Sequence, residues 1–343
     1  MSTPTTTTTA PRSLPRIRPE SLLVLAASLF GLAYYKWSGA ATAIAGVRRT
    51  GAWTRSADAL IHAATVPSAE FYIERIAVAL VFGVLLGAGL RLCASPAIIE
   101  RLTAGGSLAQ RQLVAAGSGV PLMLCSCCIT PVFSAADEAG APVASSLALM
   151  LASPALNPAA LVLTAMLFPA RIAVARLLGA LIIVLAVPLL AERIVGQRRA
   201  ASRDVRVTPL APGTGTRFVA AYLRSLWRTA IESLPIIIAG VLASALLIQR
   251  GAQLGVAQRS DALVLAAALM TLVALPTYFE IPIALLAASA GAPALAAVIL
   301  IAGPAVNLPS ILTVWRRIGM KAAIVLATGV WLVALMAGLA VRA

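Results

Sequence analysis

The chain has 343 residues, of which 60% are hydrophobic and only 11% charged, against roughly 25% charged residues in a soluble domain. The apolar residues fall in blocks of about 20, the length that crosses a hydrocarbon core. This excludes an ordinary soluble enzyme and a transmembrane β-barrel, whose strands alternate weakly. The net charge of +15 is explained by basic residues beside membrane spans rather than by nucleic acid, since no basic helix is interleaved with aromatic residues. An all-α polytopic membrane protein is therefore expected.

The N-terminal region combines a polar tail with one apolar segment. Residues 1–20 are rich in Thr and Pro and carry three arginines, which is typical of a disordered basic tail. Residues 21–47 are expected to form one extra N-terminal transmembrane helix. An A-x-A sequence at 41–43 resembles a signal-peptidase site. The aromatic and basic residues at 34–37 instead resemble an interfacial anchor, so we expect the helix to be retained.

Eight further apolar blocks follow along the chain. They form two groups, membrane repeat 1 over 72–195 and membrane repeat 2 over 230–343. The intervening residues 196–229 are polar, rich in Arg, and contain Pro and Gly, which predicts a basic cytoplasmic linker. The eight blocks cover approximately residues 73–93, 113–134, 142–168, 172–191, 230–248, 262–288, 293–315 and 322–341.

The two groups share motifs in the same order and at nearly the same spacing. Each has a proline, then Gly-Ala-Pro, then Pro-Ala-x-Asn. The offset between the groups is 151 residues for the first two motifs and 150 for the third, so one gap aligns them. Internal duplication is the usual plan of secondary transporters. The matching motifs are Pro131 and Pro282, Gly140-Ala141-Pro142 and Gly291-Ala292-Pro293, and Pro154-Ala155-Leu156-Asn157 and Pro304-Ala305-Val306-Asn307.

The asparagine of each repeat lies between prolines in the middle of an apolar block. Proline removes a backbone donor and clashes with the preceding turn, so both blocks should be broken, and the freed backbone groups must be buried or line a wet cavity. Broken helices at matching points of two repeats indicate a transport site. We therefore expect Asn157 and Asn307 to bind substrate; the alternative is a kinked helix whose Asn satisfies neighbouring backbone. The expected helix-break residues are Pro131, Pro154, Pro158, Pro282, Pro304 and Pro309.

The distribution of basic residues bears on the topology. If every block spans, the side of the linker holds 14 of 27 Lys and Arg; if 142–168 and 293–315 are re-entrant hairpins, it holds 17 of 27. The second arrangement obeys the positive-inside rule better. It leaves three full spans in each repeat, an odd number, so the repeats are inverted. The sequence thus predicts two duplicated, inverted repeats with broken or re-entrant helices.

Three of the four cysteines lie within four residues, in an apolar segment bounded by Pro121 and Pro131. In a regular helix Cys125 and Cys128 would share a face and Cys127 would point elsewhere, whereas an unwound segment brings all three together. Soft thiolates suit soft ions such as Cu(I) and, by the same logic, trivalent arsenic. We expect these cysteines to bind substrate, and we expect no resident metal or cofactor. The alternative is close packing of small apolar residues.

The matching segment of the second repeat has no cysteine and places Glu280 inside an apolar block. An ionisable residue within the membrane is costly and marks a functional site by default. Because burial disfavours the charged form of a carboxylate, we expect Glu280 to exchange protons during transport. The alternative is a carboxylate paired with an Arg near a helix end. Asp137 and Glu138, which follow the cysteines, are expected in a solvated loop.

These motifs together resemble the predicted permease family, which includes the ArsP-type organoarsenical efflux permeases. The resemblance covers roughly residues 70–341. It implies an inner-membrane permease driven by an ion gradient and, in the arsenic-exporting members, a trivalent organoarsenical cargo bound at Cys125 and Cys127. Cys128 stands where the family usually has Gly, which bears on the substrate more than on the fold. The motifs are Cys125-Ser126-Cys127-Cys128 with Pro131, Gly140-Ala141, Ser153-Pro154, and Ala302-Gly303-Pro304-Ala305-x-Asn307.

The sequence therefore predicts a secondary transporter of the bacterial inner membrane rather than an enzyme. It would export a small thiophilic or anionic solute, such as a trivalent organoarsenical, by alternating access with proton coupling; its partners would be this small-molecule or metalloid solute and the lipid bilayer. No Walker sequence is present, so the chain does not hydrolyse ATP itself. The alternative is a membrane thiol–disulfide oxidoreductase that uses the Cys125–Cys128 cluster, although the second repeat has no cysteine pair. A channel is disfavoured because no charged ring or filter repeat is present.

Overall fold

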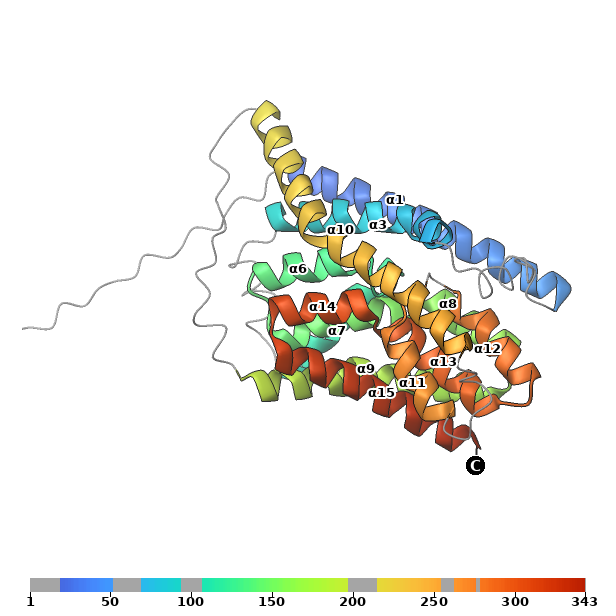
Figure 1. Cartoon of the computed structure of the whole chain (residues 1–343). Coiled ribbons are helices and arrows are strands. Elements are labelled where there is room, and N and C mark those ends of the chain that lie inside the picture. Colours follow the sequence, from blue (N-terminus) through green and yellow to red (C-terminus); the bar gives the residue numbers. More distant parts are fainter. Residues whose placement is uncertain are drawn as a thin grey trace, which may run out of the picture.

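The computed structural model describes residues 19–51, 69–93, 107–196, 215–253, 262–275 and 278–342. Within these ranges the chain forms a bundle of helices without strands (Figure 1), which confirms the all-α class. Three helices are individually long and apolar enough to cross a membrane, and two further pairs reach that length together. Nearly all of the predicted tail lies outside the described residues.

The extra N-terminal helix is α1 (Pro19–Thr50). It lies along α3 (Ala69–Cys93) at one side of the bundle (Figure 1). Its residues 22–50 are apolar enough to cross a membrane. The expected helix at 21–47 is thus present as one continuous element, a few residues longer than predicted; its retention stays a prediction.

The remaining helices repeat along the chain. Four consecutive helices of the first half begin at residues 130, 143, 158 and 170, and four of the second half begin at 280, 293, 308 and 320, each 150 residues later. The structure therefore confirms the duplication. The first half contains α3, α5 (Leu108–Gly119), a 3-10 turn (Val120–Leu122), α6 (Thr130–Glu138), α7 (Val143–Ala155), α8 (Pro158–Leu167) and α9 (Ala170–Val195). The second contains α10 (Gly215–Gln253), α11 (Ala262–Leu272), α12 (Glu280–Ser289), α13 (Pro293–Ala305), α14 (Leu308–Arg317) and α15 (Met320–Arg342).

The boundary of the linker differs from the prediction at its C-terminal side. α10 begins at Gly215, so residues 215–229 are helical although the sequence analysis assigned them to the linker. Residues 215–229 place Arg217, Arg224 and Arg228 among apolar residues, so a continuous apolar block begins only near residue 230 and the hydropathy pattern missed the helix start. Residues 197–214 of the linker lie outside the described part of the chain.

The pairs α7–α8 and α13–α14 are broken spans. Their bends of 41° and 43° leave both halves of each pair running in the same general direction. The backbone N–H of Ala144 donates to Glu192 Oε2 at 2.7 Å, and from Glu192 the helix α9 leads back about 33 Å to Ala170, next to the end of α8. The pair therefore covers the full thickness of the bundle. Of the broken and re-entrant forms weighed from the sequence, 142–168 and 293–315 therefore take the broken form, and not the re-entrant form that the charge count favoured.

Re-entrant hairpins do occur, but in the preceding blocks. A Cβ added to Gly119, the last residue of α5, would lie 2.6 Å from the carbonyl oxygen of Leu149 and 3.4 Å from Ala152, late in α7. α5 therefore ends deep in the bundle, beside the break of the α7–α8 span. After residues 123–129, α6 leads back to the short loop 139–142, where α7 begins. α5 and α6 thus enter and leave by the same end.

The second hairpin is built from α11 and α12. A Cβ added to Gly338 of α15 would lie 2.6 Å from Val298 in α13 and 3.4 Å from Leu263 at the start of α11. One added to Gly303, late in α13, would lie 3.1 Å from Leu275, just after α11. α11 therefore runs parallel to α13 into the bundle, and α12 returns to the loop before α13.

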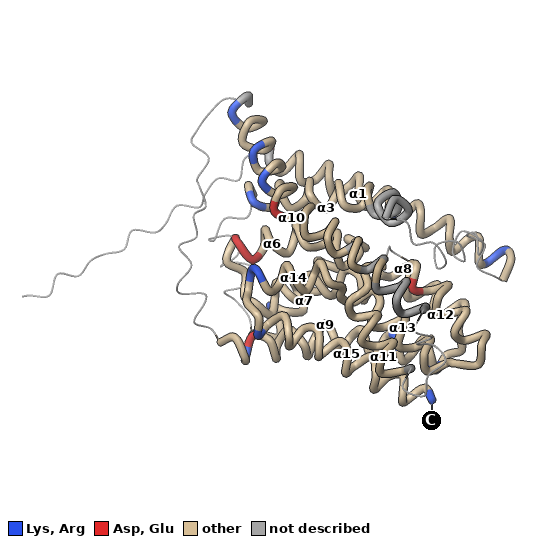
Figure 2. Tube along the Cα trace, viewed as in Figure 1, with Lys and Arg blue, Asp and Glu red and all other residues tan. Residues whose placement is uncertain are grey.

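The two halves are inverted with respect to each other. We call the end of the bundle where α9 ends and α10 begins the linker end; Figure 2 shows most of the charged residues gathered there. The α5–α6 hairpin enters from the linker end and the α11–α12 hairpin from the opposite end. Each half has three crossings and one hairpin, as expected, and moving the hairpins transfers no Lys or Arg between the two sides. The distribution of Lys and Arg between the two sides is therefore unchanged when the hairpins are reassigned, and it still obeys the positive-inside rule.

Candidate functional site

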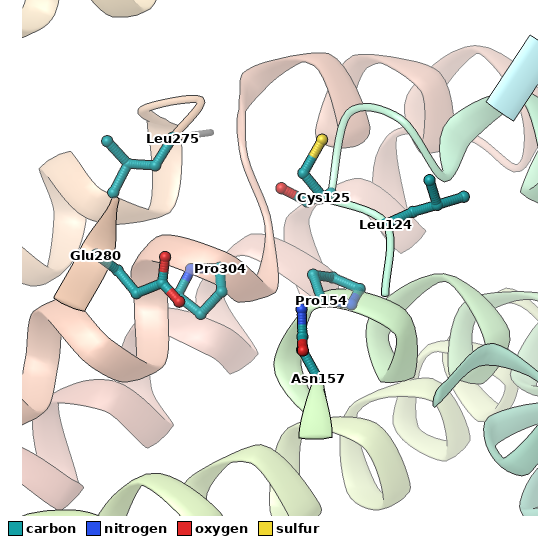
Figure 3. Close-up of a pocket in the computed structure, with 8 residues that line it drawn as sticks. Leu124, Cys125, Pro154, Asn157, Leu275, Glu280 and Pro304 are labelled. Carbon is teal, nitrogen blue, oxygen red and sulfur yellow. The ribbon is translucent and has the colours of Figure 1, made fainter. Parts of the chain in front are cut away.

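Four irregular segments meet in the middle of the bundle. They are the tips of the two hairpins and the breaks of the two spans. We call residues 123–129 the thiol tip and the described residues 273–275 and 278–280 the acidic tip. The four segments line a small cavity with a volume of about 10 Å3 (Figure 3). This is enough for roughly one water molecule. The lining residues are Leu124, Cys125, Ser126, Pro154, Asn157, Leu275, Glu280 and Pro304.

The thiol tip brings its three cysteines together, as expected for an unwound segment. The sulfurs of Cys125 and Cys127 are 3.2 Å apart and those of Cys127 and Cys128 are 3.8 Å apart, and all three lie within 4.8 Å of one another. Two sulfurs bound to one ion at about 2.3 Å lie at most about 4.6 Å apart, so both measured pairs fit one soft centre. Cys125 faces the cavity, and all three side chains are buried.

Local backbone geometry explains why the segment is not helical. Met123 has a left-handed φ of 51°, which ends the turn after Pro121. The N–H of Leu124 then donates to Ser153 Oγ at 2.9 Å, and Thr130 Oγ1 donates to the carbonyl of Cys127 at 2.7 Å. These side chains satisfy backbone groups that a continuous helix would have satisfied itself.

α3 supports the thiol tip by close backbone contact. A Cβ added to Gly83 would lie 2.2 Å from the carbonyl oxygen of Cys128, and one added to Gly87 would lie 2.8 Å from that of Pro131. Small residues allow membrane helices to approach this closely. The two glycines therefore permit the position of the thiol tip.

The acidic tip contains a buried ion pair. Glu280 is the first residue of α12 and is 3% exposed. Its Oε1 accepts a hydrogen bond from Nη2 of Arg176 in α9 at 2.9 Å. Nη1 of Arg176 donates to Thr164 Oγ1 in α8 at 2.6 Å. Glu280 is therefore paired with an Arg, the alternative considered from the sequence, although the partner lies inside the bundle and in the other half.

Arg176 was not among the candidate residues identified from the sequence. It lies within the apolar block 172–191, so the rule that selected Glu280, an ionisable residue inside a span, would also have selected it. Its pairing with Glu280 spans 104 positions and leaves no trace in local sequence. The structure thus adds Arg176 and Thr164 to the candidate site.

Both motif asparagines cap helices. Asn157 Oδ1 accepts from the backbone N–H groups of Ala159 and Ala160 at the start of α8. Asn307 Oδ1 accepts from the N–H of Ser310 at the start of α14, and its amide nitrogen donates to Ser126 Oγ of the thiol tip at 2.7 Å. Asn157 lines the cavity and Asn307 lies outside its lining. Substrate binding by either residue stays a prediction.

The six prolines fall into two kinds of position. Pro154 and Pro304 lie in the last turns of α7 and α13 and line the cavity. The others lie in the first turns of α6, α8, α12 and α14, where a missing N–H is least costly. Each break therefore has one proline that ends a helix and another that begins the next. The prolines at helix starts are Pro131, Pro158, Pro282 and Pro309.

Five charged residues form an ion-pair cluster at the linker end. Arg91 of α3 contacts Glu138 of α6 at 3.0 Å and Glu232 of α10 at 2.7 Å. Arg317 of α14 pairs with both glutamates, and Arg228 of α10 contacts Glu232 at 2.8 Å. The cluster joins the first half, which supplies Arg91 and Glu138, to the second half.

The cluster corrects the expected solvated loop at Asp137 and Glu138. Both residues belong to the last turn of α6. Asp137 is 1% exposed, and Glu138 is held by arginines of both halves. The hydropathy pattern suggested a loop because it could not show that α6 turns back towards a set of arginines.

Comparison with known proteins gives a consistent match. A protein-family sequence model described as predicted permease matches residues 68–343. The match begins one residue before α3, so it covers both halves without α1. The UPF0718 protein YraQ of Escherichia coli (strain K12) is similar, with 30% identity over 304 residues that cover 85% of this chain and 86% of that protein. No solved structure matches.

Proposed function

The chain belongs to the predicted permease family, and from this premise we propose that it is a secondary transporter of the bacterial inner membrane that exports a small thiophilic solute. The observation that carries the proposal is the central cavity, where Cys125 of the first half and Glu280 of the second half line the same space. Such sites at the meeting point of two inverted repeats are where secondary transporters bind their solutes.

A trivalent organoarsenical is the cargo best matched to the thiol tip. Arsenic in this state is thiophilic, and two or three thiols within a few ångströms can bind one soft centre. Binding exchanges arsenic–oxygen bonds for arsenic–sulfur bonds with release of water, so it needs no oxidant or reductant. Release is the reverse reaction. Reversible exchange of this kind suits a carrier better than it suits an oxidoreductase.

Alternating access is supported by the small size of the site. The cavity has room for about one water, so a solute can enter only after the segments around it separate. At the linker end, the ion-pair cluster of Arg91, Glu138, Arg228, Glu232 and Arg317 holds the two halves together. We propose that this cluster parts when the site opens towards the cytoplasm.

Proton coupling is assigned to Glu280. It lines the cavity and is the first residue of the helix that leaves the acidic tip. Its position is where a proton could exchange with the same space that holds the solute. Intramembrane carboxylates in transporters commonly serve as proton relays.

Transport assays in everted vesicles test the proposal. Vesicles that carry wild type, Cys125→Ser, Cys127→Ser or Glu280→Gln are supplied with methylarsenite, arsenite or Cu(I), with Cys93→Ser as the matched thiol control. We expect uptake of methylarsenite by wild type and Cys93→Ser, and a loss of at least about tenfold in both tip variants. Equal uptake by all four cysteine genotypes would exclude the thiol tip as the binding site.

The same assay separates the alternatives. If uptake by the Glu280→Gln variant still depends on pH as in wild type, proton coupling through this residue is contradicted. If no solute moves while Cys125 and Cys127 cycle between dithiol and disulfide in cells, the oxidoreductase interpretation replaces the transporter.

Labelling of the native thiols tests the opening at the linker end. In a Cys93→Ser background the remaining cysteines are those of the thiol tip, so a membrane-impermeant maleimide reports access to the site. Combining Glu138→Gln with Glu232→Gln should raise labelling from the linker side several-fold. Glu192→Gln is the matched control, because Glu192 binds the backbone of Ala144 within the same half. Equal labelling in both variants would contradict a gate at the cluster.

A further inference from the structure

Arg176 is the largest fully buried side chain among the described residues. Its guanidinium makes two side-chain hydrogen bonds, from Nη1 to Thr164 and from Nη2 to Glu280. Its Nε has no hydrogen-bond partner within the described part of the chain. Thr164 is itself anchored, because its hydroxyl donates to the carbonyl of Ala160 at 2.7 Å. The position of the guanidinium therefore depends on Thr164 and Glu280.

Glu280 in turn depends on Arg176 for its charge balance. α13 presents Gly303 and Pro304 to Glu280, and the segment after α11 presents Leu275, so neither offers a charge. Across the cavity, the thiol tip presents Cys125, whose thiol is the titratable group on that side. The ionic partner of Glu280 is Arg176 of α9, and the start of α12 adds the positive end of a helix dipole. 

Removing the charge of one partner of such a pair has a large cost. A buried ion pair gains little over an apolar pair, but loss of one partner leaves the other charge unpaired in a medium of low polarity. A proton that binds Glu280 in the closed state would leave Arg176 held only by the neutral hydroxyl of Thr164. Protonation is therefore opposed as long as α9 and α12 stay in contact.

We infer that Arg176 is the positioning residue that makes protonation of Glu280 depend on conformation. With α9 and α12 in contact, Arg176 holds Glu280 as the carboxylate; a proton binds when relative movement of the two halves separates the pair. The acidic tip of the second half would thus be loaded or unloaded by movement against α9 of the first half. This inference rests on the proposed role of Glu280 as the proton site.

Infrared titration of purified protein in nanodiscs tests this without any solute. The carbonyl band of the protonated acid is assigned to Glu280 by its absence in Glu280→Gln. Replacing Arg176→Gln should move the midpoint at which this band is lost to higher pH, because the carboxylate then lacks its ionic partner. Arg176→Lys keeps the positive charge and should stay nearer to wild type. Arg171→Gln removes an exposed charge from the same helix and should change nothing.

A second variant guards against misfolding of Arg176→Gln. Thr164→Val keeps both charges but removes one of the two bonds that hold the guanidinium, and it should raise the midpoint by a smaller amount. The inference is overturned if Arg176→Gln titrates like Arg171→Gln, or if Arg176→Lys shifts the midpoint as far as Arg176→Gln, since shape rather than charge would then matter. A shifted midpoint together with no transport of any solute would count against the proposed function alone.

Discussion

The two hairpin tips occupy matching places in the duplicated fold and have different chemistry. The helix that follows the thiol tip begins at Thr130 and the one that follows the acidic tip begins at Glu280, 150 residues later. The breaks and their asparagine caps are repeated in both halves. The clustered cysteines occur only at the first tip and the buried carboxylate Glu280 only at the second. The scaffold is thus repeated in both halves, and the positions where the halves differ are the candidates for specific chemistry.

Each tip is also held by the opposite half, but by a different kind of bond. Asn307 of the second half donates a neutral hydrogen bond to Ser126 of the thiol tip. Arg176 of the first half forms an ion pair with Glu280 of the acidic tip. A movement of one half against the other would therefore break a neutral contact at one tip and a charged contact at the other. The following variants measure that difference.

The largest effect is expected at the ion pair of the acidic tip. Arg176→Leu leaves Glu280 without its partner and should lower the free energy of unfolding by about 3–5 kcal/mol. The double variant with Glu280→Leu leaves no unpaired charge and should recover most of the loss. Unfolding by SDS in mixed micelles measures both. A double variant as unstable as the sum of the single variants would show that the pair is not coupled.

Glycines beside the two tips should respond differently to an added methyl group. A Cβ at Gly83 meets the backbone oxygen of Cys128 at 2.2 Å, whereas one at Gly303 meets the side chain of Leu275 at 3.1 Å. We expect Gly83→Ala to cost about 1–3 kcal/mol of unfolding free energy and Gly303→Ala less, because a side chain can move aside. Gly117, in α5, has nothing within 4 Å, and its replacement by Ala should stabilise the helix by up to about 1 kcal/mol.

One outcome would contradict the close contact between α3 and the backbone of the thiol tip. If the Gly83 and Gly117 variants change the unfolding free energy by the same amount, α3 does not press on the backbone of the thiol tip. The position of the tip would then have to be explained by its own hydrogen bonds to Ser153 and Thr130.

The two capping asparagines offer a smaller and more direct comparison. Asn157→Ala and Asn307→Ala should each lose a helix cap worth about 0.5–2 kcal/mol. Asn307→Ala should cost about 1 kcal/mol more, because it also loses the hydrogen bond to Ser126. In a Ser126→Ala background this difference should disappear. Its persistence in thermal unfolding would mean that Asn307 supports the fold in some other way.

The smallest effect on stability is expected at the thiols themselves. Cys125→Ala removes one sulfur at the edge of the cavity and should change the free energy of unfolding by about 1 kcal/mol or less. Binding of a trivalent phenylarsenical to the purified protein should nevertheless fall at least about tenfold. A large loss of stability with unchanged binding would instead support the alternative in which the cysteines serve packing.

Much of the architecture could be predicted because it is written in local patterns. Apolar blocks of about 20 residues, basic flanks and prolines around an asparagine depend on neighbouring residues alone. Comparing the blocks at a constant offset then revealed the duplication. The same local evidence placed the breaks at Asn157 and Asn307, where the structure has them.

The identity of the re-entrant segments could not be predicted in this way. A proline break interrupts a helix, but the next helix can continue at 41° or turn back, according to what the two pieces pack against. The chain continues at the Pro-Ala-x-Asn breaks and turns back at the two tips. The positive-inside count did not distinguish these cases, because exchanging them moves no Lys or Arg across the membrane.

By itself the sequence determined the membrane class, the two inverted repeats, the places of the breaks and the cysteine-rich segment, since each follows from composition or spacing along the chain. Only the tertiary structure decided which segments turn back, that Arg176 is the partner of Glu280 over 104 positions, and that Asn307 reaches Ser126 over 181. The physical reason is that a buried charge or amide needs a partner, while its own sequence neighbourhood does not say which distant helix will provide one. Packing of the two halves makes that choice.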